Sequence, residues 1–182
     1  MTQQNKTHTM VFTALMTAVL CIMGPLSLPI PISPVPISLT NLALYFICCL
    51  LGMKLGTVSY LLYLLLGFAG LPVFSGFTGG GAKLLGPTGG YLFGFIFIVL
   101  ICGWCFEHTD NRIFQFAGMI AGTALCYLFG TAWLAYQAHL SFGAALAAGV
   151  IPFIPGDIAK MLIAALIAPE LRKRVKAAVS ID

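Results

Sequence analysis

The chain has 182 residues, of which 60% are hydrophobic and 8% are charged, and its formal net charge is +4. A soluble domain has roughly 45–50% apolar and about 25% charged residues. One soluble core could not bury this much apolar surface, so lipid must surround much of the chain. The length allows a single membrane domain over residues 1–182, and so few basic residues give no support to nucleic-acid binding.

The apolar segments predict an all-α integral membrane fold with six transmembrane helices, because several are close to the roughly 20 residues that span hydrocarbon. In chain order the predicted helices cover about 10–28, 39–53, 55–69, 88–106, 113–137 and 155–178. The second and third could form one long helix, but paired glycines and Lys54 between them favour a break. No small-x-small cleavage site follows the first segment, which is interpreted as an uncleaved helix.

The basic residues predict the orientation. With six helices, seven of the nine basic residues fall on the same side of the membrane, and the positive-inside rule makes that side the cytoplasm. Both termini are then expected in the cytoplasm, and only Lys83 opposes the pattern. The residues on the predicted inner side are Lys6, Lys54, Arg112, Arg172, Lys173, Arg174 and Lys176.

Three outer loops are expected at 25–38, 70–87 and 138–155. The first carries five prolines, the second is rich in glycine, and the third contains its own apolar stretch at 143–150. Closely spaced prolines prevent a helix and favour extended backbone. Irregular backbone near membrane depth is tolerated where it is buried in protein or lines a cavity, so these loops are expected to fold over a site.

Small residues at helical spacing indicate close helix packing. Gly90 and Gly94, and likewise Gly118 and Gly122, are four residues apart within predicted helices. Such pairs let two backbones approach closely. The alanines at positions 14 and 18 have the same spacing, and from spacing alone internal packing is the simpler interpretation for them.

The strongest functional signal is an acid and a base one helical turn apart. Asp157 and Lys160 are at i and i+3, so they share a face, and both are embedded in an apolar segment. Charge within a membrane segment is costly and indicates function by default. The alternative is an ion pair that only satisfies itself, although buried pairs stabilise poorly. Together the two groups suit a ligand with N–H donors at one point and a carbonyl or anionic group at another.

The second signal is the glycine-rich stretch from Gly70 to Gly94. Glycines allow backbone amides to approach a ligand, and Phe74, Phe77 and Tyr91 could form an apolar wall. Gly81 to Lys83 resembles a phosphate-binding loop only superficially, because the GK[ST] ending and a preceding strand are both missing. ATP hydrolysis by this chain is therefore not expected, while a plain flexible loop remains the alternative.

No metal centre or catalytic motif is predicted. Cys102, Cys105 and His108 have a spacing like that of metal ligands, but no further Cys/His pair closes a tetrahedral site. The six cysteines all lie in apolar runs, where cysteine behaves as a small hydrophobe. Trp104 and Trp133 lie near helix ends and are interpreted as anchors at the membrane interface.

Three sequence motifs resemble the BioY family, the biotin-binding S-components of energy-coupling-factor (ECF) transporters. They are found in order along the chain at 31–39 (PISPVPISL), at 70–76 (GLPVFSG) together with 85–91 (LGPTGGY), and at 152–160 (PFIPGDIAK). The resemblance implies a six-helix S-component in the bacterial cell membrane that captures biotin from outside. It also implies an ECF coupling transmembrane subunit and two cytoplasmic ATPases as partners, and no cofactor apart from biotin as transported ligand.

The resemblance also implies roles for particular residues. Asp157 and Lys160 match the polar ligand contacts of the family, and Ala14 and Ala18 match the helix face that docks the coupling subunit. Under this interpretation Asp157 accepts the ureido N–H groups of biotin, Lys160 meets a carbonyl or the carboxylate, and loop residues enclose the remainder. The loop residues expected at the ligand are Phe74, Ser75, Gly79, Gly89 and Tyr91.

Three other functions stay open at this point. A stand-alone secondary transporter for biotin or a similar small molecule would need a coupling-ion site, and the sequence shows one buried acid–base pair. An intramembrane enzyme could use Asp157, Lys160 and His139, although no catalytic motif supports it. A pure scaffold would leave the acid–base pair unexplained.

Overall fold

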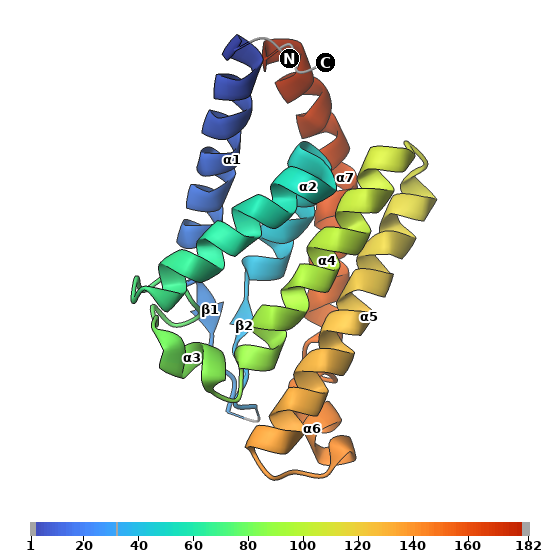
Figure 1. Cartoon of the computed structure of the whole chain (residues 1–182). Helices are drawn as coiled ribbons and strands as arrows, with labels where there is room; N and C mark the ends of the chain where they lie inside the picture. Colours follow the sequence, from blue (N-terminus) through green and yellow to red (C-terminus); the bar gives the residue numbers. More distant parts are fainter. Residues whose placement is uncertain (1–2, 32, 180–182) are drawn as a thin grey trace.

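The computed structural model, which describes residues 3–31 and 33–179, is mostly helical. The two-residue strands β1 (Ser27–Leu28) and β2 (Ile37–Ser38) pair antiparallel beside the helices. Figure 1 shows that α1 begins and α7 ends at one end of the molecule, while α3, α6 and both strands lie toward the other. The helices are α1 (Gln3–Met23), α2 (Thr40–Phe68), α3 (Gly81–Leu85), α4 (Gly89–His108), α5 (Arg112–Gln137), α6 (Phe142–Gly149) and α7 (Ile154–Val179).

Several helices are suited to crossing a membrane. Within the described residues, α2, α4 and α5 are each long and apolar enough to do so, and α6 with α7 forms a fourth candidate bent by 50°. The apolar part of α1, Thr7–Met23, is shorter. Many large apolar side chains on these helices are exposed, as expected where lipid is the solvent. The all-α multi-pass membrane fold is confirmed, while the count of six spans and their orientation stay predictions.

A sharp break divides α2 at Gly52. This residue has φ +72° and ψ −165°, a conformation that is essentially restricted to glycine. The carboxylate of Glu107 accepts a hydrogen bond of 2.8 Å from the backbone N–H of Met53, and so caps the arm that begins there. The two arms of α2 diverge from this point (Figure 1). They correspond to the predicted second and third helices, with the break at Gly52 rather than at Lys54.

Most helix ends agree with the predicted bounds, and the differences have local causes. The first helix covers Gln3–Met23 rather than 10–28. It begins earlier because the polar residues before the apolar run join the helix, and it ends earlier because Pro25 lies two residues beyond Met23 and the chain then enters β1. Two short helices, α3 and α6, lie inside the predicted outer loops. The side chain of Ser141 accepts a hydrogen bond from the backbone N–H of Ala144, which caps the start of α6.

Small residues bring α4 and α5 together. A Cβ atom on Gly94 would lie 3.0 Å from the carbonyl oxygen of Cys126, and one on Gly122 would lie 2.9 Å from Cα of Ile98. Larger residues at either position would therefore push the helices apart. This contact confirms the close packing that the glycine spacing predicted.

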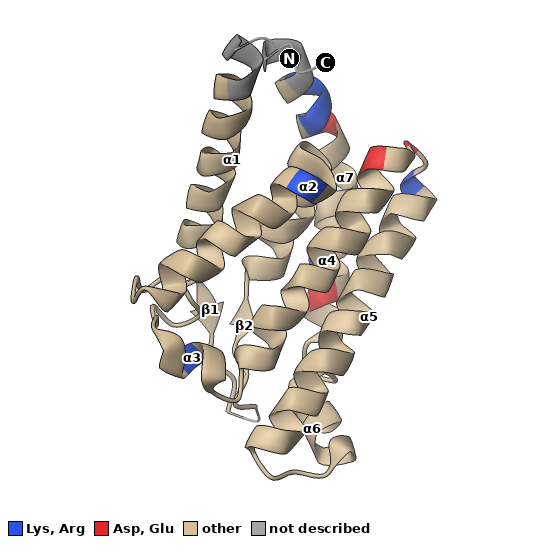
Figure 2. Ribbon diagram, viewed as in Figure 1, with Lys and Arg blue, Asp and Glu red and all other residues tan. Residues whose placement is uncertain are grey.

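The charged residues are distributed unequally between the two ends of the molecule. Figure 2 shows basic residues in α2, at the start of α5 and near the end of α7, all toward the end where α1 begins. The basic residue of α3, Lys83, is at the opposite end, and partial burial lowers the pKa of its ammonium group. The side chains of Lys6 and Lys176 lie outside the part that is described.

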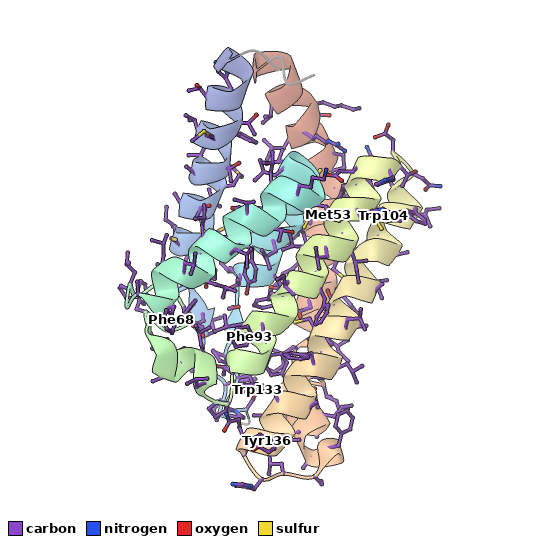
Figure 3. The ribbon with its side chains drawn as sticks, in the orientation of Figure 1. Met53, Phe68, Phe93, Trp104, Trp133 and Tyr136 are labelled. Atoms are coloured by element: carbon purple, nitrogen blue, oxygen red, sulfur yellow. The ribbon has the colours of Figure 1, made fainter. Side chains whose placement is uncertain are left out.

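Aromatic side chains mark both ends of the helical body. Trp104 lies toward the end that carries the basic residues, whereas Trp133 and Tyr136 lie toward the end with α6 (Figure 3). The indole N–H of Trp133 donates to the carbonyl oxygen of Gly86 at 2.9 Å. Tryptophan and tyrosine favour the two water interfaces of a membrane, so these positions agree with their interpretation as interfacial anchors.

Candidate functional site

A chamber lies between the helices, on the side of their midpoint that faces α3 and α6. Its space amounts to about 650 Å³ when the open space at its mouth is included. The chamber is lined by α2, α4, α5, α6 and α7 and by the loops before α2, α3, α4 and α7. Its polar lining is Ser38, Thr40, Asn41, Ser75, Thr88, Tyr91, Thr123, Tyr127, Asp157 and Lys160.

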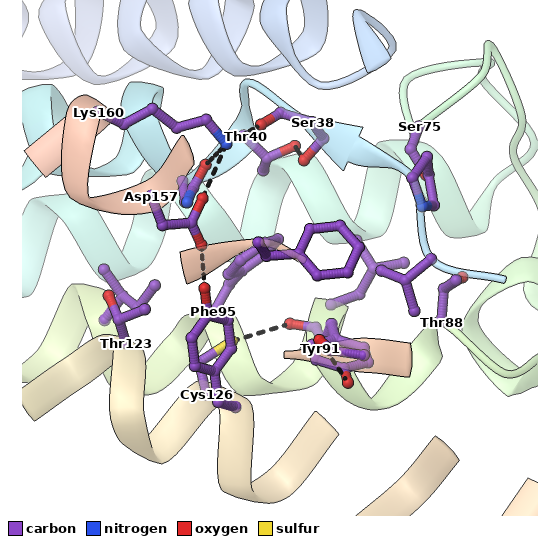
Figure 4. Close-up of a pocket in the computed structure, with 18 residues that line it drawn as sticks. Ser38, Thr40, Ser75, Thr88, Tyr91, Phe95, Thr123, Cys126, Asp157 and Lys160 are labelled. Atoms are coloured by element: carbon purple, nitrogen blue, oxygen red, sulfur yellow. Dashed lines mark hydrogen bonds and ion pairs between the residues drawn. The ribbon is translucent and has the colours of Figure 1, made fainter. Parts of the chain in front are cut away.

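An ion pair holds one end of the chamber. Lys160 Nζ lies 2.9 Å from Asp157 Oδ1, and the two side chains are 10% and 9% exposed. Both come from the first turns of α7, where a spacing of three residues places them on one face. Figure 4 shows the pair directed into the chamber, which confirms the shared face that the sequence predicted.

Lys160 uses all of its hydrogen-bonding capacity within the protein. Besides Asp157, its ammonium group donates to the carbonyl oxygen of Ser38 at 2.7 Å and to Oδ1 of Asn41 at 3.1 Å. A lysine ammonium has three donors and no acceptor. Lys160 therefore joins β2, α2 and α7, and a ligand carbonyl or carboxylate could bind it only by displacing one of these partners.

Asp157 keeps free acceptor capacity. Its second oxygen, Oδ2, accepts a hydrogen bond of 2.5 Å from the hydroxyl of Tyr127 on α5. A carboxylate has about four acceptor positions, and Lys160 and Tyr127 occupy two of them. The carboxylate is thus held in place from two sides while it still offers two positions to N–H donors in the chamber.

The opposite side of the chamber carries two hydroxyl groups. Ser75 comes from the loop before α3 and Thr88 directly precedes α4, and both lie across the chamber from Asp157 in Figure 4. Within the described residues, neither side chain makes a hydrogen bond. Apolar groups lie between the two polar ends, namely Leu92, Phe95, Ile98, Cys126 and Phe153.

Tyr91 connects α4 with the end of α6. Its hydroxyl donates to the carbonyl oxygen of Gly149 at 3.1 Å, and its ring packs over Gly130. A Cβ atom on Gly149 would lie 2.1 Å from the Tyr91 hydroxyl, and one on Gly130 would lie 2.3 Å from the ring. Only glycine fits at these two positions, so the wall of the chamber depends on them.

The structure separates the predicted ligand contacts into two groups. Asp157, Lys160, Ser75 and Tyr91 line the chamber, whereas Phe74, Gly79 and Gly89 do not. Phe74 is fully buried and packs edge-on against Tyr63 with ring centroids 5.5 Å apart.

The two glycines serve the loop backbone. A Cβ atom on Gly79 would lie 2.3 Å from the carbonyl oxygen of Leu71, and one on Gly89 would lie 1.7 Å from that of Leu84. Their contact with a ligand, like that of the other predicted residues, stays a prediction.

Sequence reasoning missed two residues that position the ion pair. Asn41 lies in the first turn of α2 and Tyr127 in the middle of α5, and each contacts one member of the pair. An amide in an apolar segment is a signal that could have pointed to Asn41. Tyr127 is one of several aromatic residues in α5 and offers no comparable signal.

The predicted docking face lies away from the chamber. Ala14 and Ala18 are on the exposed side of α1, while Thr13 and Thr17 on the other side are buried. Thr17 and Ser59 lie within hydrogen-bonding distance of each other, at 3.0 Å, which joins α1 to α2. The exposed alanines leave a shallow surface on which another helix could lie.

The sequence profile of the BioY family matches residues 1–177. The biotin transporter BioY of Thermotoga maritima is 40% identical over 144 residues, covering 79% of this chain and 85% of the relative. The biotin transporter BioY of Lactococcus lactis subsp. cremoris is 35% identical over 181 residues, covering 96% and 95%. A crystal structure of the S-component for biotin from an ECF-type ABC transporter matches with a TM-score of 0.88 and 34% identity, covering 95% of both chains.

Proposed function

Because the chain belongs to the BioY family, we propose that it is the biotin-binding S-component of an ECF transporter. It captures biotin from outside the cell and delivers it inward together with a transmembrane coupling subunit and two cytoplasmic ATPases. The chain itself is a binding and transport subunit without an ATPase site. Its place is the bacterial cell membrane, with the basic end of the molecule and both termini in the cytoplasm.

The chamber supports this proposal by its arrangement of polar and apolar groups. Biotin has a ureido group with two N–H donors at one end, an apolar sulfur ring in the middle and a carboxylate on a flexible tail. The chamber has a carboxylate at one end, an apolar middle and hydroxyl groups at the other end. A dry pocket makes every unpaired polar group costly, which favours a ligand that satisfies both ends.

Asp157 is the residue that we assign to the ureido group. Its carboxylate can accept a hydrogen bond from one ureido N–H, and a hydrogen bond to a charged group contributes about 1.5–3 kcal/mol. Lys160 has all three donors occupied. We therefore assign it a positioning role, in which it holds Asp157 and the loop before α2 in place.

Ser75 and Thr88 are assigned to the tail of biotin. Each hydroxyl can donate one hydrogen bond to a carboxylate oxygen, and within the described residues neither has a partner inside the protein. Tyr91 serves as a wall of the chamber because its own hydroxyl is engaged with Gly149.

Entry of biotin requires movement of the outer loops. The lining residues Val35, Ser75, Gly149 and Phe153 come from three separate connections that meet over the chamber. Loops that lie outside regular elements are the parts of a fold that open most easily. We propose that they close over bound biotin, and that ATP hydrolysis in the partner then drives release toward the cytoplasm.

Equilibrium binding to the purified chain tests the proposal. Radiolabelled biotin is expected to bind without any partner subunit, and dethiobiotin, which keeps the ureido group, is expected to compete. Lipoate, which has a sulfur ring and a carboxylate tail but no ureido group, is expected not to compete. Equal competition by lipoate and dethiobiotin would contradict a ureido site at Asp157, and absence of biotin binding would contradict the function itself.

Assembly with the coupling subunit tests the role of α1. Enlarging the exposed alanine face with Ala14→Leu and Ala18→Leu is expected to abolish co-purification of the coupling subunit and leave biotin affinity within twofold. Leu15→Ala, on the same exposed side, serves as the control that changes side-chain size without filling the alanine face. Transport by the isolated chain in vesicles, without ATPases, would instead support a stand-alone transporter.

A further inference from the structure

A second cavity lies at the opposite end of the molecule from the outer loops. It opens between the ends of α4 and α7 and the start of α5, and its space amounts to about 890 Å³ including the open space at its mouth. Its charged lining consists of Asp110, Arg112, Arg172 and Lys173. We call it the basic cavity, and it takes no part in the chamber described above.

The basic cavity has an excess of positive charge without internal compensation. Its lining contains three cationic side chains and a single carboxylate, that of Asp110. Arg112, Lys173 and Asp110 are exposed, and no ion pair involves any of them within the described part of the chain. The cations are therefore free to bind an anion from outside the chain.

Arg172 supplies a second, independent indication. Its Nη1 donates to the carbonyl oxygen of Phe106 at 2.8 Å, in the last turn of α4. Its Nε is shielded from solvent and has no hydrogen-bond partner among the described residues. A charged donor that is buried without an acceptor is costly, so Arg172 would gain a hydrogen bond if its guanidinium turned toward an acceptor oxygen in the basic cavity, which it lines.

A proline of α7 also lines this space. Pro169 lines the basic cavity from inside the helix. Proline has no N–H and clashes with the carbonyl of the preceding turn, so it loosens the helix at that point. The basic residues that follow in α7 lie at the end of the molecule where basic residues gather (Figure 2), the level at which long cationic side chains reach the membrane interface.

We propose that the basic cavity binds a phosphate group, supplied by an anionic phospholipid headgroup or by free phosphate. Arginine presents a planar fork of donors that suits phosphate oxygens, and lysine adds a point charge. Arg172 would donate from its guanidinium group, and Arg112 and Lys173 would bind the outer oxygens. Basic pockets between transmembrane helices at the cytoplasmic side are suited to anionic headgroups.

Native mass spectrometry of the purified chain in detergent tests this site, with phosphatidylglycerol and phosphatidylcholine as probes. We expect phosphatidylglycerol to bind more tightly than phosphatidylcholine. The double variant Arg112→Gln, Lys173→Gln is expected to bind phosphatidylglycerol about 30-fold more weakly, since each interfacial cation contributes roughly a fivefold gain. Biotin affinity should stay within twofold in this variant, which shows that it remains folded.

The matched control is Arg174→Gln, which removes one charge from the same helix. Arg174 is 77% exposed, pairs with Glu170 at 3.3 Å and does not line the basic cavity. It is expected to leave phosphatidylglycerol binding within twofold. A similar loss in the control, equal binding of the two lipids, or unchanged binding by the double variant would overturn the proposal.

Competition with inorganic phosphate distinguishes the two sources. If millimolar phosphate displaces phosphatidylglycerol from the wild type and itself binds less well to the double variant, the phosphate ion alone is a sufficient ligand. If it does not displace the lipid, the glycerol headgroup and acyl chains contribute and the ligand is the lipid. The test is made in detergent, so it does not depend on the proposed orientation in the membrane.

Discussion

Replacing Asp157 with Asn is the sharpest perturbation of the chamber, because the amide keeps the shape of the side chain and removes its charge. In the wild type the carboxylate accepts from Lys160 on one oxygen and from Tyr127 on the other. The amide offers one acceptor oxygen in place of two and adds two donors. It can therefore no longer offer the ureido group a charged acceptor.

The size of the effect follows from these contacts. Loss of one charge-assisted hydrogen bond of about 1.5–3 kcal/mol predicts biotin binding that is roughly 10- to 150-fold weaker. Removing one partner of a buried ion pair typically costs about 3–5 kcal/mol of stability. The lower end is expected here, because Lys160 keeps Ser38 and Asn41 as acceptors.

Titration calorimetry with biotin and chemical unfolding measure the two effects separately. A second variant, Asp157→Asn with Lys160→Met, removes the uncompensated cation as well. It is expected to regain most of the lost stability and to stay weak in biotin binding. Wild-type affinity in Asp157→Asn, or recovery of affinity in the double variant, would show that the pair is only structural and would refute the assignment.

Three further predictions concern contacts that stabilise the chamber and the break in α2. Tyr127→Phe removes the donor to Asp157 and is expected to lower the free energy of unfolding by about 1.5–3 kcal/mol, measured by chemical denaturation. Gly52→Ala forces alanine into a conformation restricted to glycine and places a Cβ atom 2.2 Å from Glu107 Oε1. It is expected to lower the free energy of unfolding by at least about 1–3 kcal/mol in the same assay. Gly149→Ala displaces the Tyr91 hydroxyl. It is expected to lower the free energy of unfolding by about 1–3 kcal/mol and to weaken biotin binding measured by calorimetry.

Each of these predictions has a control within the chain. Tyr136→Phe changes a tyrosine that is 80% exposed and should leave stability unchanged. Gly143→Ala places its methyl group in open space on α6 and should be neutral or slightly stabilising. Tyr91→Phe removes the atom that clashes in Gly149→Ala, so the combined variant should recover part of the loss. Effects as large in the controls as in the test variants would contradict the assigned contacts.

The sequence predicted the broken second helix well, since the signals were local. Paired glycines and a lysine that is unfavourable at mid-membrane both indicated a break near Gly52. The early end of α1 was not predicted, because the apolar run continues beyond Met23 into a strand. Hydropathy alone does not distinguish a helix from an extended apolar segment.

The position of the ion pair was predictable from the sequence, but the hydrogen-bond partners of Lys160 were not. Spacing on α7 placed Asp157 and Lys160 on one face, and the apolar surroundings indicated function. The partner of Lys160 on α2 lies 119 residues away in sequence. No local pattern encodes such a contact, so the saturation of the lysine donors by Ser38 and Asn41 could be found only in the folded chain.

The glycine-rich stretch illustrates an ambiguity between packing and binding. Glycine permits close approach of a ligand and equally of another backbone segment. At Gly79 and Gly89 the neighbour is a carbonyl of the loop itself, whereas Ser75 and Tyr91 line the chamber. Composition predicted that this stretch encloses something, and the folded backbone determines which residues face inward.

A crystal structure of the purified chain grown with biotin tests the central assignment most directly. We expect one ureido nitrogen within about 3 Å of the Asp157 carboxylate, the sulfur ring between Leu92 and Phe153, and the tail directed to Ser75 and Thr88. Lys160 should keep its contacts with Ser38 and Asn41. Biotin bound with its ureido group away from Asp157, or outside the chamber altogether, would contradict the account.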